Sequence, residues 1–254
     1  AKFTKKANEI IHKPQRKRSK LHQELEKYLL VSPQRKFVLS IDRLDYSKGI
    51  PNRLRAFELF LERYPEFHNQ VTLIMLVVPS RSKVKKYKML KREIDELVGK
   101  INGRFSDANY MPVWYFYRSM PFERLIELYC TSEVALITPV RDGMNLVAKE
   151  YVASRYNQTG VLIISEMAGA AKEMGEALVI NPVNESEIAE TIFQALTMPK
   201  EEQCRRMLVL QERISRYGVV KWAGEFTREL KKVKNIQQNY LAKLVTTQVS
   251  NNIV

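Results

Sequence analysis

The sequence has few of the residues on which thiol, histidine and metal chemistry depend. Its 254 residues include two cysteines, Cys130 and Cys204, and three histidines. The cysteines lack the spacing of metal ligands or of a redox pair, which favours reduced thiols in a cytoplasmic protein. The histidines fall outside the loops in which other polar residues gather. We therefore expect neither a metal site nor a histidine-based nucleophile pair.

Long apolar runs are absent as well. No stretch approaches the roughly 18 residues of a membrane span, and no apolar run follows the basic residues 1–6, as it would in a secretory signal. We therefore expect neither a membrane protein nor a secreted one. Neither a Gly-x-Gly-x-x-Gly motif nor a P-loop occurs, which argues against the usual dinucleotide and nucleoside-triphosphate sites.

Acidic residues are outnumbered by basic ones. The chain has 42 Lys and Arg against 28 Asp and Glu, a formal net charge of +14. A basic surface can bind nucleic acid, whereas a basic cleft can hold phosphorylated small molecules. The densest basic clusters, residues 13–20 and 83–92, have little aromatic interleaving, and no nucleic-acid-binding motif is present. We therefore favour phosphorylated small molecules as ligands and expect no nucleic acid.

Six short apolar runs alternate with helical patterns along the chain. Most runs are apolar on both faces, as in strands buried on both sides of a parallel sheet. The alternation predicts an α/β fold with a Rossmann-like, doubly wound parallel sheet. We expect residues 1–18 to form a basic, irregular lead-in, 19–239 the domain, and 240–254 a tail or linker. The predicted strands are residues 36–41, 71–78, 113–117, 134–137, 160–164 and 177–180.

Residues 138–150, which follow the fourth run, form the most informative stretch. Asp142 and Glu150 supply two carboxylates, Gly143 permits a backbone conformation closed to other residues, and Asn145 is a good N-cap. A helix that starts after Asn145 presents free amides and the positive end of its dipole, which favour anions. Ligands of open α/β sheets bind at this carboxyl edge. Such a turn can also serve helix capping alone, so the residues of the neighbouring loops are needed to distinguish a ligand site from a simple cap.

Cations are predicted at the same edge of the sheet. Arg43 and Lys48 follow the first run, and Arg81 follows the second. Arginine can grip a phosphate through two hydrogen bonds, whereas lysine acts as a point charge. Each could be a solvated loop charge, but three cations that converge on a carboxylate-bearing turn suit a ligand with several phosphates.

Four stretches of this edge resemble the trehalose-6-phosphate synthase family. They are residues 41–50 (IDRLDYSKGI), 78–81 (VPSR), 138–150 (TPVRDGMNLVAKE) and 166–171 (EMAGAA). The family consists of retaining glycosyltransferases of GT-B architecture, with two facing Rossmann-like domains. The resemblance implies transfer of glucose from UDP-glucose to glucose 6-phosphate, giving trehalose 6-phosphate and UDP, with no metal or other cofactor.

The resemblance is to the C-terminal, donor-binding half of that family. The N-terminal GT-B half, with the family's glycine loop and most acceptor contacts, is therefore an expected partner. A C-terminal phosphatase domain is a further candidate partner. No carboxylate is evidently placed as a nucleophile, and the resemblance implies a front-face mechanism in which the departing phosphate helps to accept the acceptor's proton.

The resemblance also implies roles for individual residues. Arg43 and Lys48 would hold the donor diphosphate, and Asp142 with the amides after it would hold the transferred glucose; these three are the expected catalytic residues. Arg81 would reach the acceptor phosphate, and backbone near Met120 would read the uracil. Leu146 to Glu150 would close on the nucleotide, with Glu150 on the ribose. The expected donor-binding turn comprises Asp142, Gly143, Met144, Asn145, Leu146, Val147, Ala148, Lys149 and Glu150.

Two alternatives stay open. The chain could be a non-catalytic sugar-nucleotide-binding or regulatory module of a trehalose synthase/phosphatase assembly. It could also belong to a related transferase that uses GDP-glucose, because the implied contact with the base is mainly backbone.

Overall fold

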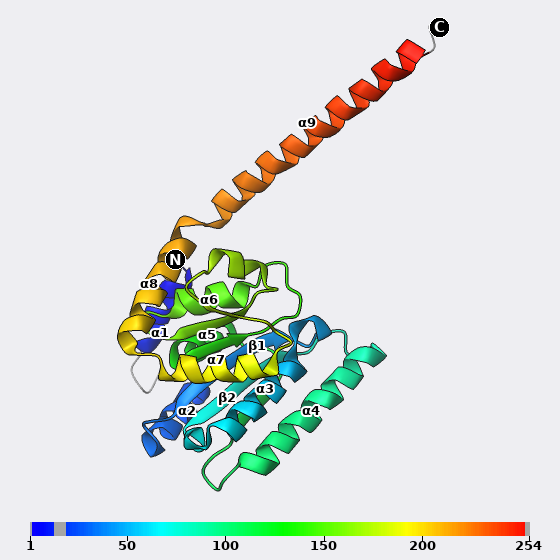
Figure 1. Cartoon of the computed structure of the whole chain (residues 1–254). Helices are drawn as coiled ribbons and strands as arrows, with labels where there is room; N and C mark the ends of the chain where they lie inside the picture. The colour runs from blue at the N-terminus through cyan, green and yellow to red at the C-terminus, as the bar shows by residue number, and fades with distance from the viewer. Residues whose placement is uncertain (1, 13–18, 252–254) are drawn as a thin grey trace. The chain divides into compact units, whose positions relative to one another are not determined.

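The computed structural model describes residues 2–12 and 19–251 (Figure 1). The chain forms two compact units, Ala1–Arg213 and Ile214–Val254. The first holds the sheet and all the predicted site residues. The second consists of the end of one helix and a further long helix. Of the helices in the described ranges, none has the length and apolar character that crossing a membrane requires.

The sheet contains six parallel strands in the order β3-β2-β1-β4-β5-β6. From β1 the chain proceeds outward to β3, then crosses back to β4 and proceeds outward in the other direction. β1 and β4 therefore flank the switch point, where doubly wound sheets bind their ligands. This topology confirms the predicted fold class. The strands are β1 (Lys36–Arg43), β2 (Val71–Val78), β3 (Val113–Tyr117), β4 (Val134–Ile137), β5 (Val161–Ser165) and β6 (Leu178–Ile180).

Helices cover both faces of the sheet (Figure 1). On one face α3 packs between α4 and α7, and on the other α1, α5 and α6 pack together. Leu54 and Phe57 of α3 are fully buried against the strands, and each such side chain contributes roughly 1.5–3 kcal/mol of hydrophobic stabilisation. The helices are α1 (Lys2–Ile11), α2 (Lys20–Val31), α3 (Ile50–Arg63), α4 (Lys85–Phe105), α5 (Phe122–Thr131), α6 (Leu146–Ser154), α7 (Glu185–Thr197), α8 (Lys200–Arg216) and α9 (Val219–Asn251), with short 3-10 helices η2 (Tyr46–Lys48), η3 (Pro65–Phe67) and η4 (Gly169–Glu173).

The N-terminal segment differs from the prediction. The expected irregular lead-in is wrong for α1, which is helical and packs on α5 and α6. Ala7 and Ile10 are buried beside Ile126, and Phe3 packs against the same cluster. The spacing of positions 3, 7 and 10 is helical, but it is hard to recognise among the surrounding lysines. Residues 13–18 lie outside the described ranges.

The C-terminal segment also differs from the prediction. The last helix, expected to end near residue 239, continues as α9 to Asn251. After Gly224 the sequence contains no proline or glycine that would end it. The remaining residues, 252–254, lie outside the described ranges.

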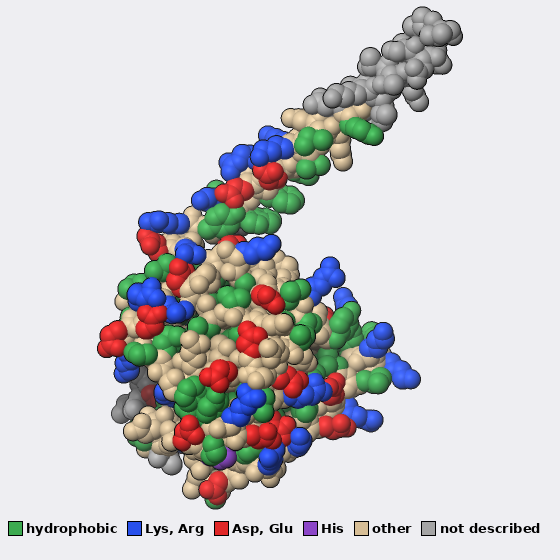
Figure 2. Space-filling view, in the orientation of Figure 1, with side chains coloured by type: hydrophobic (Ala, Val, Ile, Leu, Met, Phe, Trp, Pro, Cys, Tyr) green, Lys and Arg blue, Asp and Glu red, His purple; other side chains and the backbone are tan. Residues whose placement is uncertain are grey.

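Basic and acidic side chains both lie on the surface over α4 (Figure 2). Lys91 pairs with Asp95 on the same helix, and Arg104 pairs with Glu62 on α3. Much of the basic character of this helix is therefore balanced locally.

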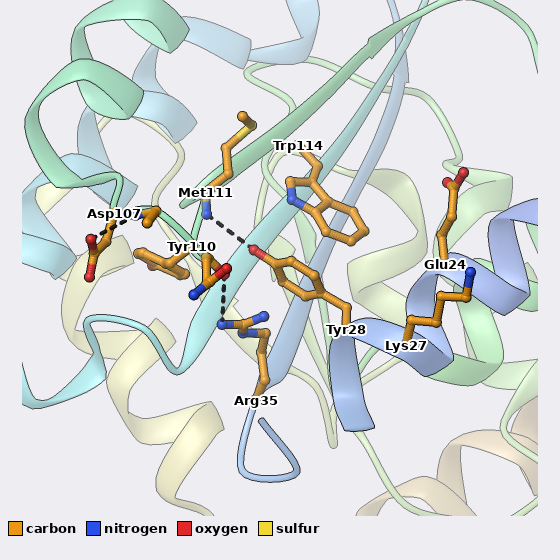
Figure 3. Close-up of a pocket in the computed structure, with 10 residues that line it drawn as sticks. Glu24, Lys27, Tyr28, Arg35, Asp107, Tyr110, Met111 and Trp114 are labelled. Carbon is orange, nitrogen blue, oxygen red and sulfur yellow. Dashed lines mark hydrogen bonds between the residues drawn. The ribbon is translucent and has the colours of Figure 1, made fainter. Parts of the chain in front are cut away.

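The amino edge of the sheet carries an open pocket of ≈ 560 Å³ (Figure 3). The Arg35 guanidinium carbon lies 3.8 Å from the centroid of the Tyr28 ring, and that ring meets Trp114 edge-on at 4.6 Å between centroids. The Met111 amide donates to the Tyr28 hydroxyl at 3.1 Å. These contacts join α2 to the starts of β1 and β3. The pocket therefore lies at the opposite end of the strands from the polar turn.

Candidate functional site

The turn between β4 and α6 contacts the loop that follows β1. Lys48 Nζ, at the end of η2, lies 2.6 Å from Asp142 Oδ2, and the two side chains are 12% and 16% exposed. Asp142 also accepts hydrogen bonds from the Met144 amide (3.3 Å) and the Asn145 side chain (3.1 Å). Burial alone would raise the pKa of Asp142, but these hydrogen bonds and the charge of Lys48 hold that pKa below its ordinary value. Asp142 is therefore an ionised, acceptor-rich group beside a cation.

Asn145 is the N-cap of α6, as predicted. Its side-chain oxygen accepts from the Ala148 amide at 3.0 Å. Within the described part of the chain, the amides of Leu146 and Val147 donate to no other group, so this helix start keeps donors for an anion or a hydroxyl.

The special backbone conformation expected at Gly143 is found at another residue. The left-handed residue of the turn is Asn145, with φ 77°, whereas Gly143 has no positive φ and a Cβ added there would meet no atom within 4 Å. Asparagine tolerates this conformation better than most side chains because it can bond locally to the backbone. One residue thus both forms the bend and caps the helix.

The segment after β5 is joined to the turn through backbone contacts. The Asp142 amide donates to Met167 O at 3.2 Å, and the Gly169 amide donates back to Asp142 O at 2.9 Å. A Cβ on Gly169 would stand 2.2 Å from Gly143 O, a distance that real Cβ atoms do not reach. The glycine at position 169 is therefore required for this close approach.

Arg43 and Arg81 lie at the same edge, as predicted. Arg43 is the exposed last residue of β1 and pairs in register with Val78 at the end of β2. Arg81 has φ 45° and donates to the Tyr87 hydroxyl at 3.0 Å. That hydroxyl donates in turn to Asp45 at 3.2 Å. Among the described residues neither arginine forms an ion pair, so both charges are available to a ligand.

Glu150 is held by a residue that the sequence did not indicate. The buried Tyr129 of α5 donates its hydroxyl to Glu150 Oε2 at 2.8 Å. Burial raises the pKa of Glu150, and the tyrosine hydrogen bond opposes that shift. Met120 lies half-buried at the carboxyl edge between β3 and α5. Of the other turn residues, Lys149 pairs with Glu173 at 2.7 Å; Gly143, Met144 and Leu146 are exposed, Val147 is half-buried, and Asn145 and Ala148 are buried.

Arg53 is a second residue absent from the predicted set. It is fully buried in the first turns of α3, and it bonds Asp42 and Thr138 at the two ends of the site. The sequence did contain a signal for the burial of Arg53, because position 53 lies four residues before Phe57 on the buried stripe of α3. Arginine is rarely buried there without a partner. No group of three or more His, Cys, Asp or Glu side chains among the described residues could hold a metal ion.

The chain is similar to known proteins in sequence and in fold. The sequence profile described as Glycosyltransferase family 20 matches residues 7–232. A bifunctional trehalose-6-phosphate synthase/phosphatase from Thermoproteus tenax is 47% identical over 216 residues, 85% of this chain and 30% of that protein. A crystal structure of the UDP-forming α,α-trehalose-phosphate synthase from Burkholderia xenovorans in complex with glucose-6-phosphate superposes with a TM-score of 0.83 at 35% identity, covering 91% of this chain and 49% of the other.

A trehalose-6-phosphate structure from E. coli, bound with UDP-2-fluoro glucose, gives a TM-score of 0.82 at 34% identity and covers 91% of this chain and 49% of the other. The chain thus spans about half of these solved chains and less than half of the T. tenax protein. The match to the family profile covers nearly the whole chain, and the resemblance found in the four sequence stretches is confirmed: this chain belongs to glycosyltransferase family 20.

Proposed function

We propose that this chain is the donor-binding half of a trehalose-6-phosphate synthase, which transfers glucose from UDP-glucose to glucose 6-phosphate and releases UDP. The observation that carries the proposal is the contact between Lys48 and Asp142 at the switch point of the sheet. It supports the proposal because a cation that could bind phosphate lies directly beside a carboxylate that could accept hydrogen bonds from sugar hydroxyls. The relatives bound with UDP-2-fluoro glucose and with glucose-6-phosphate support these two substrates.

In the proposed reaction the cations stabilise the leaving group. Cleavage of the glycosyl–phosphate bond develops negative charge on the diphosphate, and Arg43 and Lys48 would stabilise that charge. Lys48 must then exchange its bond to Asp142 for one to phosphate, or share its three donors between them. Arg81, exposed at the end of the neighbouring strand, would take the phosphate of the acceptor.

Asp142 is proposed to hold the sugar rather than attack it. Its carboxylate is already engaged by Lys48 and Asn145, and a ligand hydroxyl could join these donors. This supports a front-face reaction in which the departing phosphate helps to take the acceptor's proton. The amides of Leu146 and Val147 would bond the donor, while Glu150 would accept from the ribose hydroxyls.

The remaining elements of the proposal concern partners and setting. We propose that the donor is held by cationic side chains without a metal, and that backbone near Met120 reads the base. A facing N-terminal GT-B half would supply the other wall of the cleft. A phosphatase partner is supported by the T. tenax relative, whose name carries both activities. The free cysteines, Cys130 and Cys204, are in keeping with a cytoplasmic protein.

The test is UDP release measured with both substrates. Holding an acceptor in position can account for roughly 7–11 kcal/mol of a barrier, and of the residues proposed for the site only Arg81 is assigned to the acceptor. We therefore expect residues 1–254 to bind UDP without forming trehalose 6-phosphate, and a chain joined to an N-terminal GT-B half to form it. Acceptor-dependent release by residues 1–254 alone would contradict the half-enzyme proposal. A folded, joined chain that binds UDP but releases none from UDP-glucose would point to a regulatory module.

A further inference from the structure

Arg53 is a buried cation that links the elements of the site from below. Its side chain has 0% exposure. The guanidinium donates from Nε to Thr138 Oγ1 at 2.9 Å and from Nη2 to Asp42 Oδ2 at 2.8 Å. Nη2 also donates to the Lys48 carbonyl at 3.1 Å, and Nη1 donates to the Ser40 hydroxyl. These four acceptors belong to β1, η2 and the start of the β4–α6 turn.

The charge of Arg53 is balanced by Asp42 within the protein. The Asp42 carboxylate is 4% exposed, and an unpaired charge at such a depth would be strongly unfavourable. Burial raises the pKa of Asp42, while the charge and hydrogen bond of Arg53 oppose that shift. Asp42 is therefore the counterion of Arg53 and does not face a ligand.

The segments that Arg53 joins are those that carry Lys48 and Asp142. The amides of Val140 and Arg141 donate to Ser47 O at 2.9 and 3.1 Å, so η2 and the turn also meet through their backbones. Gly49, with φ 62°, allows this approach because a Cβ there would lie 2.5 Å from Thr138 O. These two backbone bonds lie near the surface of the edge. The four Arg53 bonds fix the same junction from within the core.

We propose that Arg53 is a positioning residue for the phosphate-binding edge. It sets the placement of η2 relative to the β4–α6 turn, and thereby of Lys48 relative to Asp142, without touching a ligand. The part that concerns nucleotide affinity rests on the proposed donor site. Arginine suits this task because its planar fork offers five donors in fixed directions. A lysine could still pair with Asp42, but it could not reach Thr138 and the Lys48 carbonyl together.

A purely stabilising role is the competing explanation, and Arg155 provides the matched control. Arg155 is 3% exposed and follows the C-terminal end of α6. Its guanidinium donates to the carbonyls of Tyr129, Cys130, Ser132 and Thr159. It is therefore an equally buried arginine with a comparable set of bonds, but none of them reaches the predicted site residues.

The experiment compares Arg53→Lys, Thr138→Val and Arg155→Lys in the 254-residue chain. Thermal unfolding, the affinity for UDP, and hydrogen exchange at the Val140 and Arg141 amides are measured for each. We expect Arg53→Lys and Arg155→Lys both to lower Tm. Of these two variants, only Arg53→Lys should also weaken UDP binding, by roughly tenfold, and speed hydrogen exchange at the Val140 and Arg141 amides. Thr138→Val keeps the buried ion pair but leaves Arg53 Nε without its acceptor, so it should lower Tm less than Arg53→Lys does and give the same two local effects in smaller measure.

Two results would overturn the proposal. One is unchanged exchange at Val140 and Arg141 in a folded Arg53→Lys variant. The other is an equal loss of UDP affinity and amide protection in Arg155→Lys, which would show a general effect of destabilisation. If Arg53→Lys does not fold, Thr138→Val decides by the same readouts. If the parent chain itself does not bind UDP, the proposed function fails, whereas the exchange measurements still test the positioning role.

Discussion

In this structure the lysine proposed to bind the donor diphosphate is held by a carboxylate of the same site. Lys48 Nζ donates to Asp142 Oδ2 at 2.6 Å, and both side chains are mostly buried. A diphosphate must take Lys48 from Asp142 or share it. The diphosphate, itself negative, also comes close to the negative charge of Asp142. Replacing Asp142 by asparagine removes the competing charge but keeps a side-chain oxygen that can accept from the Met144 amide.

The expected change in UDP affinity depends on how far the Lys48–Asp142 pair is exposed to solvent. A hydrogen bond to a charged group contributes about 1.5–3 kcal/mol, whereas exposed ion pairs contribute about 0.2–1 kcal/mol. Lys48 has three donors and need not give up Asp142 completely. We therefore take about 1 kcal/mol as the penalty that Asp142 imposes on UDP, and expect Asp142→Asn to bind UDP roughly fivefold more tightly. Glucosyl transfer by the joined, two-domain protein should fall, because the sugar loses its carboxylate.

Calorimetric titration with UDP measures this change, and Asp45→Asn is the matched control. Asp45 lies at the same edge and caps η2 by accepting from the Ser47 amide at 2.9 Å, a role that asparagine can also fill. The Lys48 amide donates to the Asp45 carbonyl at 3.1 Å, but among the described hydrogen bonds the Asp45 carboxylate does not contact the Lys48 ammonium, so its variant should tighten UDP binding less. Equal tightening in both variants would show a general charge effect. Unchanged or weaker binding by Asp142→Asn would refute the competition.

The same contact sets the pH dependence of the effect. The pKa of Asp142 lies below its ordinary value, so the carboxylate stays ionised at neutral pH. The stabilisation from its pairing is complete above the ordinary pKa of aspartate and is lost only as pH falls through the lowered one. The ratio of UDP affinities of Asp142→Asn and the parent should therefore be constant between about pH 7.5 and 8.5, where the terminal phosphate of UDP, with a second pKa of about 6, is ionised throughout. A ratio that moves toward one within that range would contradict this assignment.

Three further outcomes are expected. Arg43→Ala should weaken UDP binding by about ten- to a hundredfold, because it removes a charged hydrogen bond; equal affinity by titration would remove Arg43 from the site. Glu150→Gln should lower nucleotide affinity with little change in Tm, since helix propensities are close and glutamine can still accept from Tyr129; a Tm loss with unchanged binding would indicate a structural role. Gly169→Ala should destabilise the chain by about 1–3 kcal/mol in chemical unfolding, because its Cβ would collide with the β4–α6 turn, whereas Gly99→Ala, in open space on α4, should be neutral or stabilising.

Strands that are buried on both faces could be predicted from the sequence almost to the residue. β2 has this character, since its eight residues are nearly all apolar and Pro79 follows them directly. The end of β1 was harder to predict. The strand was predicted to stop at Ile41, because Asp42 and Arg43 have the polarity of a loop. The structure continues it to Arg43, since the Asp42 carboxylate finds a buried partner in Arg53. That partner lies on the following helix, beyond what a local pattern can indicate.

In the site, too, the features set by local interactions could be predicted from the sequence, and those set by distant interactions could not. The cap formed by Asn145 and the cations Arg43, Lys48 and Arg81 were predictable, because capping is local and parallel strands bring the ends of their loops to one edge. The bond between Lys48 and Asp142 joins positions 94 residues apart, and only the packed structure supplies it. Gly143 was assigned a conformation that belongs to Asn145, because glycine is the usual marker of a left-handed residue.

The two aspartates at the switch point show why residue type alone does not assign a role. Asp42 and Asp142 each pair with a cation, through bonds of 2.8 and 2.6 Å. Asp42 is sealed beneath the edge, 4% exposed against a fully buried Arg53, so no ligand can take its place in that pair. Asp142 and Lys48 remain partly open, 16% and 12% exposed, so a ligand can reach this pair. A fixed pair below an exchangeable one gives the edge rigid geometry and replaceable charges, and the proposed diphosphate site would use both.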